Sequence, residues 1–370
     1  MVTQAQIRMR TPRLAWDDVI AANAPGIAVF LILSFAPHAE AQARIQIHDC
    51  RPSCSQVEFR TVARVGGHHG DSVLLMLPSV PIRLGGGGYV AGRTAEPGVV
   101  AVYDSLGGFR RTLGHAGGGP GEFRQPQAFF GPLGQTWVVD PGNARITVLD
   151  ANGHPINDFR YNGRVFYTAP LDSSRVVVSG PMESGGTYSP YAFHIMDSRG
   201  RVLRSFAPWP ANRQNRRVAV TPWGTVVATY EDRYVVEEWS IQGELLRTLT
   251  RDVSWFPPGS RPGFREPGLA NTAVDETGRL WIVLIRPKPG LQPIRRNRPV
   301  RGLETLTENA DAVVEVIDMS TAEVVARGER DNPYLFPLFP FTQEYRTPAQ
   351  DSLGYYSFLI IRAAVSGPPE

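Results

Sequence analysis

Arginine and aromatic residues occur together in several segments of this chain, and such pairs could bind an anion or a sugar. The guanidinium group donates charge-assisted hydrogen bonds to carboxylates and phosphates, and it also stacks on aromatic rings. Aromatic residues and arginine are enriched where proteins bind one another. We therefore predict a binding role for eight residues. They are Trp209, Arg213, Arg216, Trp255, Arg261, Arg265, Arg286 and Tyr188. The alternative is that these segments are solvated loops whose aromatic side chains pack beneath irregular backbone.

Three histidines form a second candidate set, His68, His69 and His115. Neutral imidazole is a common metal ligand and can act as a general base near neutral pH. A zinc or calcium ion held by these side chains would suit a lyase or a hydrolase. No His-x-x-x-His spacing is present, however, and no loop has the alternating carboxylates of a calcium site. No cofactor is therefore expected, and the metal enzyme is kept as an alternative.

A repeat positions these residues. Five copies of a β-branched strand, a polar turn and a second strand run through the chain. Their turn residues are Asp104, Asp150, Asp197, Ser240 and Asp318, spaced 46, 47, 43 and 78 residues apart. Another turn and strand precede each copy. Four strands at a period in the forties predict the blade of a β-propeller. The Asp and Ser side chains should accept hydrogen bonds from backbone N–H groups two residues on.

One copy, residues 114–160, resembles the NHL repeat. The resemblance is carried by Gly119–Phe123, Pro126, Val139–Asp140, Asn143, Arg145–Ile146 and Asp150–Gly153. It implies a bacterial six-bladed propeller that binds partners on its surface. Members include scaffolds, binding modules and a minority of lyases and hydrolases, but no enzyme motif of the family matches here. Asp140, Asn143 and Arg145 occupy the repeat's own loop position, where they are expected to satisfy backbone groups.

The predicted fold is all-β: a six-bladed propeller of four-stranded blades, in which an N-terminal strand completes the last blade. Residues 335–365 are too short for four strands after their Pro-rich start, and residues 57–66 have the pattern of an outermost strand. Pairing the two would join the termini and remove an open sheet edge. The long loops all fall on one face of such a ring, together with the candidate residues. Function is expected on that face.

The N-terminus predicts export. Arg8, Arg10 and Arg13 precede the apolar run Gly26–Ala36, and small residues follow it. The run is too short to span a bilayer, so no stable membrane span is expected once the signal is removed. An uncleaved anchor is the alternative. Cys50 and Cys54, the only cysteines, should form a disulfide in an oxidising compartment. The predicted domains are a signal peptide (1–43), an N-terminal segment (44–56), the propeller (57–366) and a tail (367–370).

Composition limits the partners. The net charge is only +3 and the N-terminus predicts export, so no nucleic acid is expected to bind. We predict a monomeric, periplasmic or extracellular binding module for a protein, peptide or glycan on the loop-rich face. One alternative is a metal-dependent lyase or hydrolase at the mouth of the channel. The other is a structural scaffold without a small ligand.

Overall fold

The computed structural model describes residues 43–51, 53–67, 81–92, 96–184, 186–209, 215–259, 266–289, 309–332, 335–337, 343–351 and 356–367. They belong to one unit, residues 41–370. Within these ranges the structure is all-β, and the helical element is a single 3-10 turn, η1 (Pro141–Asn143). No helix of the described chain is long and apolar enough to cross a bilayer.

Four antiparallel sheets are each built from strands that follow one another in the chain. The first contains β3 (Ile82–Arg83), β4 (Tyr89–Ala91), β5 (Val100–Tyr103) and β6 (Phe109–Leu113). The second contains β7 (Gln127–Phe130), β8 (Thr136–Asp140), β9 (Arg145–Leu149) and β10 (Pro155–Arg160). The third contains β11 (Tyr167–Pro170), β12 (Arg175–Ser179), β15 (Tyr191–Asp197) and β16 (Val202–Pro208). A small hairpin, β13 (Glu183–Ser184) and β14 (Thr187–Tyr188), lies between β12 and β15.

The fourth sheet gains a strand from the N-terminus. Its consecutive strands are β17 (Arg216–Val220), β18 (Val226–Tyr230), β19 (Val235–Trp239) and β20 (Leu245–Thr250). Beside β20, in parallel, runs β1 (Ala43–Gln46). The sequence pattern does not predict this strand.

The last sheet joins the two ends of the unit. Its strand order is β21-β22-β23-β24-β2-β27-β26-β25. The strands are β21 (Gly268–Val274), β22 (Leu280–Pro287), β23 (Ala310–Asp318), β24 (Glu323–Arg330), β2 (Ser55–Val65), β27 (Tyr356–Ser366), β26 (Glu344–Gln350) and β25 (Phe336–Pro337). The N-terminal β2 pairs with β27 in antiparallel fashion from Gln56 to Val65, and with β24 in parallel over only two residues.

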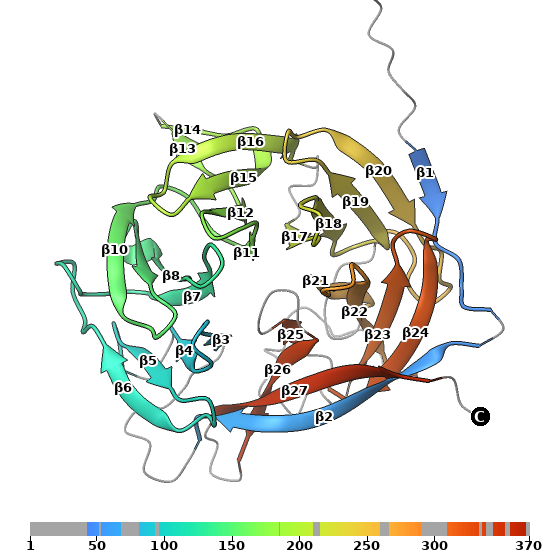
Figure 1. Ribbon diagram of the computed structural model, residues 1–370, viewed down its shortest axis with the longest axis horizontal. Helices are drawn as coiled ribbons and strands as arrows, with labels where there is room; N and C mark the ends of the chain where they lie inside the picture. The colour runs from blue at the N-terminus through green and yellow to red at the C-terminus, as the bar shows by residue number, and fades with distance from the viewer. Residues whose placement is uncertain are drawn as a thin grey trace, which may run out of the picture. The chain divides into compact units, whose positions relative to one another are not determined.

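The sheets of this unit surround a common centre, and the first strand of each consecutive run lies nearest to it (Figure 1). Around the centre these inner strands follow the order β3, β7, β11, β17, β21 and β25, and neighbours along this series contact one another from β3 to β25. The arrangement is of the propeller type. It gives the ring a central space lined by inner strands, and it places β7 opposite β21 and β11 opposite β25 (Figure 1).

The core consists of clusters that lie between neighbouring sheets. Val100 and Val102 of the first sheet contact Val138 and Leu149 of the second, and similar clusters fill the next interfaces. Middle strands are therefore buried on both faces, as the uniform burial of β8 shows. This is why these strands have apolar runs instead of strict alternation.

The polar turns form as predicted. The Oδ1 atom of Asp104 accepts hydrogen bonds from the N–H groups of Leu106 and Gly108, each at 2.9 Å. Asp150, Asp197 and Asp318 accept backbone hydrogen bonds in the same way. These bonds fix each hairpin turn between two strands of one sheet.

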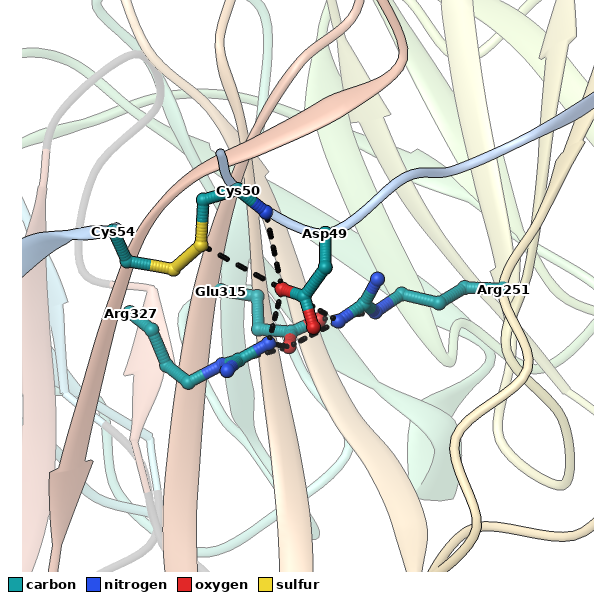
Figure 2. The surroundings of a disulfide bond; sticks show 6 residues. All are labelled: Asp49, Cys50, Cys54, Arg251, Glu315 and Arg327. Atoms are coloured by element: carbon teal, nitrogen blue, oxygen red, sulfur yellow. Dashed lines mark hydrogen bonds and ion pairs between the residues drawn. A yellow bond between two sulfur atoms is a disulfide. The ribbon is translucent and has the colours of Figure 1, made fainter. Parts of the chain in front are cut away.

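The segment from β1 to β2 connects the outer edges of two sheets, at β20 and at β24. After β1, His48 bridges to Glu323 of β24, and the Cys50–Cys54 disulfide, which the sequence predicted, closes the connecting loop. Beside the disulfide, Asp49 reaches two arginines (Figure 2). Further on, the β5–β6 turn meets β2 closely at Gly107, which has φ +87°, and a Cβ atom there would lie 1.9 Å from the Arg64 oxygen. Only glycine permits this approach.

Candidate functional site

A cavity of about 360 Å³ occupies the centre of the ring. Its lining includes residues of all six inner strands, from Ile82 of β3 to Phe336 of β25, together with Arg346 of β26. Gln127 and Tyr167, which begin β7 and β11, line it as well. Both follow loops that connect one sheet to the next, so the cavity extends to the face on which function was predicted. The volume is at the lower end of the range for small-ligand sites.

One side of the cavity is aromatic. Phe129 and Phe130 of β7 contribute to it, and Phe166 and Tyr167 follow at the start of β11. All four line the cavity and are partly buried, and Phe130, Phe129 and Tyr167 also pack against the core clusters between neighbouring sheets. An aromatic wall of this kind can stack against an apolar or planar ligand.

A neutralised arginine lies next to the aromatic wall. The guanidinium carbon of Arg217 is 4.1 Å from the centre of the Tyr167 ring. Arg217 forms an ion pair with Glu231 at 3.2 Å and donates a hydrogen bond to Oδ1 of Asn271 at 3.2 Å. The Tyr167 hydroxyl donates to the same Glu231 carboxylate at 2.9 Å. Burial raises the pKa of Tyr167 to about 12, so the phenol stays protonated.

The positive charge of Arg346, by contrast, is not neutralised by a carboxylate of the described residues. Its side chain lines the cavity and is 8% exposed, and among the described residues its Nε and Nη1 atoms have no hydrogen-bond partner. Burial alone lowers its pKa to about 9, which leaves the guanidinium charged at neutral pH. An uncompensated buried charge costs several kcal/mol, roughly, unless a counter-ion is supplied. The cavity beside it is where a counter-ion could reside.

A second, smaller cavity of about 250 Å³ lies between the second and third sheets. Tyr188, one of the predicted binding residues, lines it with Glu183, Arg164 and Tyr161. Burial raises the pKa of Tyr161, whose hydroxyl has no partner within the described chain. This cavity is the place where the structure brings a predicted residue to a recess of the surface.

The other predicted residues that the structure describes have partners within the fold. Arg216 begins β17 and is 2% exposed, because its guanidinium lies against the Phe193 ring at 4.8 Å and donates to Glu237 at 2.6 Å. Trp209 and Trp255 are half-buried and pack against core clusters, and Arg286 pairs with Glu329. These placements agree with the alternative in which aromatic side chains hold loops from beneath.

Three of the predicted arginines, Arg213, Arg261 and Arg265, lie outside the described residues. The protein, peptide or glycan partner of the loop-rich face therefore stays a prediction.

Of the three histidines, the structure describes one. His115 is exposed, and its Nε2 atom lies 3.1 Å from Oε1 of Glu122. His68 and His69 lie outside the described residues. Within the described chain, the only group of three side chains close enough to share a metal is Asp49, Cys50 and Cys54, and its two cysteines form the disulfide.

The Asp140 set stabilises the loop of the repeat. Asp140 is 1% exposed and accepts hydrogen bonds from the backbone N–H groups of Arg124 at 3.0 Å and Gln125 at 2.8 Å. Asn143 donates to Asp140 at 2.8 Å and to the Gly117 carbonyl at 2.9 Å, while Arg145 donates to the Gly119 carbonyl at 2.9 Å. As predicted, these side chains satisfy backbone groups.

Replacing Asp140 with alanine should lower the free energy of unfolding by about 1–3 kcal/mol, because two backbone N–H groups and the Asn143 amide lose their acceptor. Urea denaturation monitored by tryptophan fluorescence would measure the loss. Asp158→Ala, on the exposed strand β10, is the matched control and should change stability by less than about 0.5 kcal/mol. Equal effects of the two variants would contradict the scaffold role of Asp140.

Two polar residues of the central cavity, Asn271 and Arg346, were missed by sequence reasoning. They lie in an inner strand or beside one, and nothing in the local pattern shows that six strands converge. A usable signal was present: a charged residue in the middle of a buried strand, as in Glu344–Gln350, requires a partner or a ligand.

No protein-family model matches the chain, and no curated protein matches it. Two solved structures are similar in fold. A protein of Bacteroides fragilis NCTC 9343 whose name marks it as exported has a TM-score of 0.55 at 11% identity, covering 87% of this chain and 100% of that one. A member of the DUF4221 family from Bacteroides vulgatus has a TM-score of 0.55 at 10% identity, covering 85% and 100%.

A regucalcin from Agrobacterium tumefaciens, described as calcium-binding, is more distant. Its TM-score is 0.42 at 13% identity, covering 87% of this chain and 97% of that one. At these identities the similarity concerns the fold alone. The chain is an all-β protein of the propeller type, and its function has to be argued from its own residues.

Proposed function

We propose that the chain is an exported, six-bladed propeller that binds a small organic ligand in its central cavity. The observation that carries the proposal is the cavity of about 360 Å³, whose lining combines aromatic side chains with polar and charged ones. Concave sites with apolar walls and a few polar groups are typical of small-ligand binding.

Six blades follow if the eight-stranded sheet is two blades. Strands β21–β24 form one antiparallel run, and β25, β26, β27 and β2 form the other. The parallel contact between the runs involves only Ser55 and Gln56 of β2, so it is a local contact at their outer edges. The N-terminal strand β2 then completes the sixth blade and closes the ring.

Export is supported by residues at the N-terminal side of the ring. The apolar run Gly26–Ala36 has the length of a signal-peptide core. The Cys50–Cys54 disulfide is a bond that persists in the periplasm or outside the cell.

The function can be tested by asking what the protein carries when it is purified from its source. Native mass spectrometry of the mature protein should detect a bound small molecule that is released on denaturation. Ala128→Trp, which adds an indole to the cavity lining, should remove the bound mass. Ala364→Trp, on the exposed side of β27, is the control and should retain it.

A bound compound retained by Ala128→Trp would show that the ligand lies elsewhere. The absence of a bound compound from the wild-type protein and from both variants would contradict a small-ligand function.

A further inference from the structure

We propose that the ligand of the central cavity is an organic carboxylate, whose anionic head pairs with Arg346 and whose apolar body lies against the aromatic wall of β7 and β11. This inference rests on the proposed function and specifies the chemical class of the ligand.

Arg346 carries a buried positive charge that lacks a counter-ion among the described residues. The side chain is 8% exposed, and two of its three guanidinium nitrogens have no hydrogen-bond partner in the described part of the chain. The other cavity arginine, Arg217, is paired with Glu231 at 3.2 Å. Arg346 therefore leaves one positive charge uncompensated at the cavity wall. A buried charge of this kind is tolerated when a counter-ion binds.

Arg346 and the aromatic residues of β7 and β11 lie on opposite sides of the cavity. Arg346 lies directly opposite Phe336 in the β25–β26 pair, and Asn271 of β21 donates a hydrogen bond to the Leu335 carbonyl just before β25. Arg346 and Asn271 thus share one side of the cavity, which also includes Phe336. The aromatic residues of β7 and β11 lie across the ring, because β7 faces β21 and β11 faces β25 (Figure 1).

The two sides together define the ligand. An inorganic anion would neutralise Arg346 but would not contact the aromatic wall. A neutral apolar molecule would contact the aromatic wall but would leave the charge of Arg346 unpaired. A molecule with a carboxylate at one end and an apolar body at the other satisfies both. Thr168 on β11 adds a hydroxyl that also lines the cavity and has no partner within the described chain.

Phenylacetate and its neutral isostere phenylacetamide are suitable probes. We expect the wild-type protein to bind phenylacetate at millimolar concentration in a calorimetric or NMR titration. Phenylacetamide should bind about ten- to a hundredfold more weakly, since it lacks the charge that strengthens hydrogen bonds to guanidinium. Arg346→Met should weaken phenylacetate binding by about the same factor and leave phenylacetamide binding unchanged.

Loss of binding in Arg346→Met should not come from unfolding. This variant removes an unpaired buried charge, so its unfolding temperature should equal or exceed that of the wild type. Two further variants serve as controls. Arg346→Lys retains the charge and should keep a measurable preference for phenylacetate. Arg201→Met, an exposed arginine paired with Asp197 in a turn of the third sheet, should bind both probes as the wild type does.

Three results would overturn the proposal. Equal binding of phenylacetate and phenylacetamide, unaffected by Arg346→Met, would make the ligand neutral while leaving the cavity as its site. Tighter binding of phenyl phosphate than of phenylacetate, lost in Arg346→Met, would replace the carboxylate with a phosphate ester. Failure of both probes to bind at 10 mM, about tenfold above a millimolar dissociation constant, would exclude an aromatic carboxylate as the ligand. The proposed function is judged separately, by whether Ala128→Trp loses the co-purified compound.

Discussion

Glu315→Ala should destabilise the protein by about 3–5 kcal/mol, the cost of removing one partner from a buried ion pair. Glu315 lies on β23, and its side chain is 2% exposed. Its carboxylate forms ion pairs with Arg251 at 3.1 Å and Arg327 at 2.7 Å (Figure 2). It also accepts a hydrogen bond from the Tyr234 hydroxyl at 2.6 Å. Without the carboxylate, two guanidinium groups lose their main counter-charge. The free energy of unfolding from urea titrations would measure the effect.

The reason for so large an effect is burial. The Arg251 side chain is 5% exposed, and its remaining acidic neighbour, Asp49, is 60% exposed and lies 3.3 Å away. Burial and the charge of Glu315 raise the pKa of Tyr234, so its hydroxyl stays protonated and donates to the carboxylate. Removal of Glu315 would leave that donor unsatisfied as well.

Two variants separate charge from shape. Glu315→Gln keeps the volume and one acceptor oxygen, so it should cost less than the alanine variant. Glu329→Ala removes a carboxylate from the half-exposed pair with Arg286 and should cost less than about 1 kcal/mol. A loss for Glu315→Ala no larger than that for Glu329→Ala would contradict the view that the buried network contributes to stability.

The network also explains how the N-terminal segment is held. Although partial burial opposes it, the charges of Arg251 and Arg327 lower the pKa of Asp49. Asp49 is therefore ionised at neutral pH, and it joins the disulfide loop to Arg327 of β24 and to Arg251, the residue that follows β20 of another sheet (Figure 2).

Local patterns predicted the repeated parts of the fold well. The turn at Asp104 and its equivalents depends on residues within four positions, so a short sequence window contains all the information. The disulfide spans five residues and is equally local. The Asp140 set was predictable for another reason: its partners, although 15 to 26 residues away, all lie within one copy of the repeat.

Contacts between distant segments were not predictable in this way. The sequence pattern favours a loop at Arg216, yet β17 begins there. The side-chain partners of Arg216 come from β15 and β19. Glu315 meets Arg251 across 64 residues. The environment of Arg346 depends on strands from the whole ring, because the cavity exists only once all inner strands converge. A single sequence does not show which charged residues of buried strands meet.

Deleting the chain through Val65 should have the second large effect, the loss of cooperative folding. The deletion removes β2, which pairs with β27 from Gln56 to Val65. It also removes Val57, which is 6% exposed, and Val65, which is 0% exposed. Burial of two valines contributes about 3–6 kcal/mol, a large part of the roughly 5–15 kcal/mol that stabilises a typical protein.

The deletion would also expose the edge of β27. An unpaired strand edge is a template for pairing with another chain, so the variant that begins at Gly66 should form oligomers or aggregate. Size-exclusion chromatography and thermal unfolding would detect both effects. A variant that begins at Ser55 retains β2 but lacks β1 and the disulfide, and it should remain folded with reduced stability.

Addition of a peptide covering residues 55–65 tests whether strand pairing is the cause. If β2 closes the ring, the peptide should bind the Gly66 variant, reduce its oligomers and raise its unfolding temperature. A peptide of the same composition in scrambled order should not, because register on β27 depends on which residues face the core. A Gly66 variant that is monomeric and unfolds cooperatively near the wild-type temperature would show that the ring holds together without β2. The inner strands alone would then have to position the central cavity.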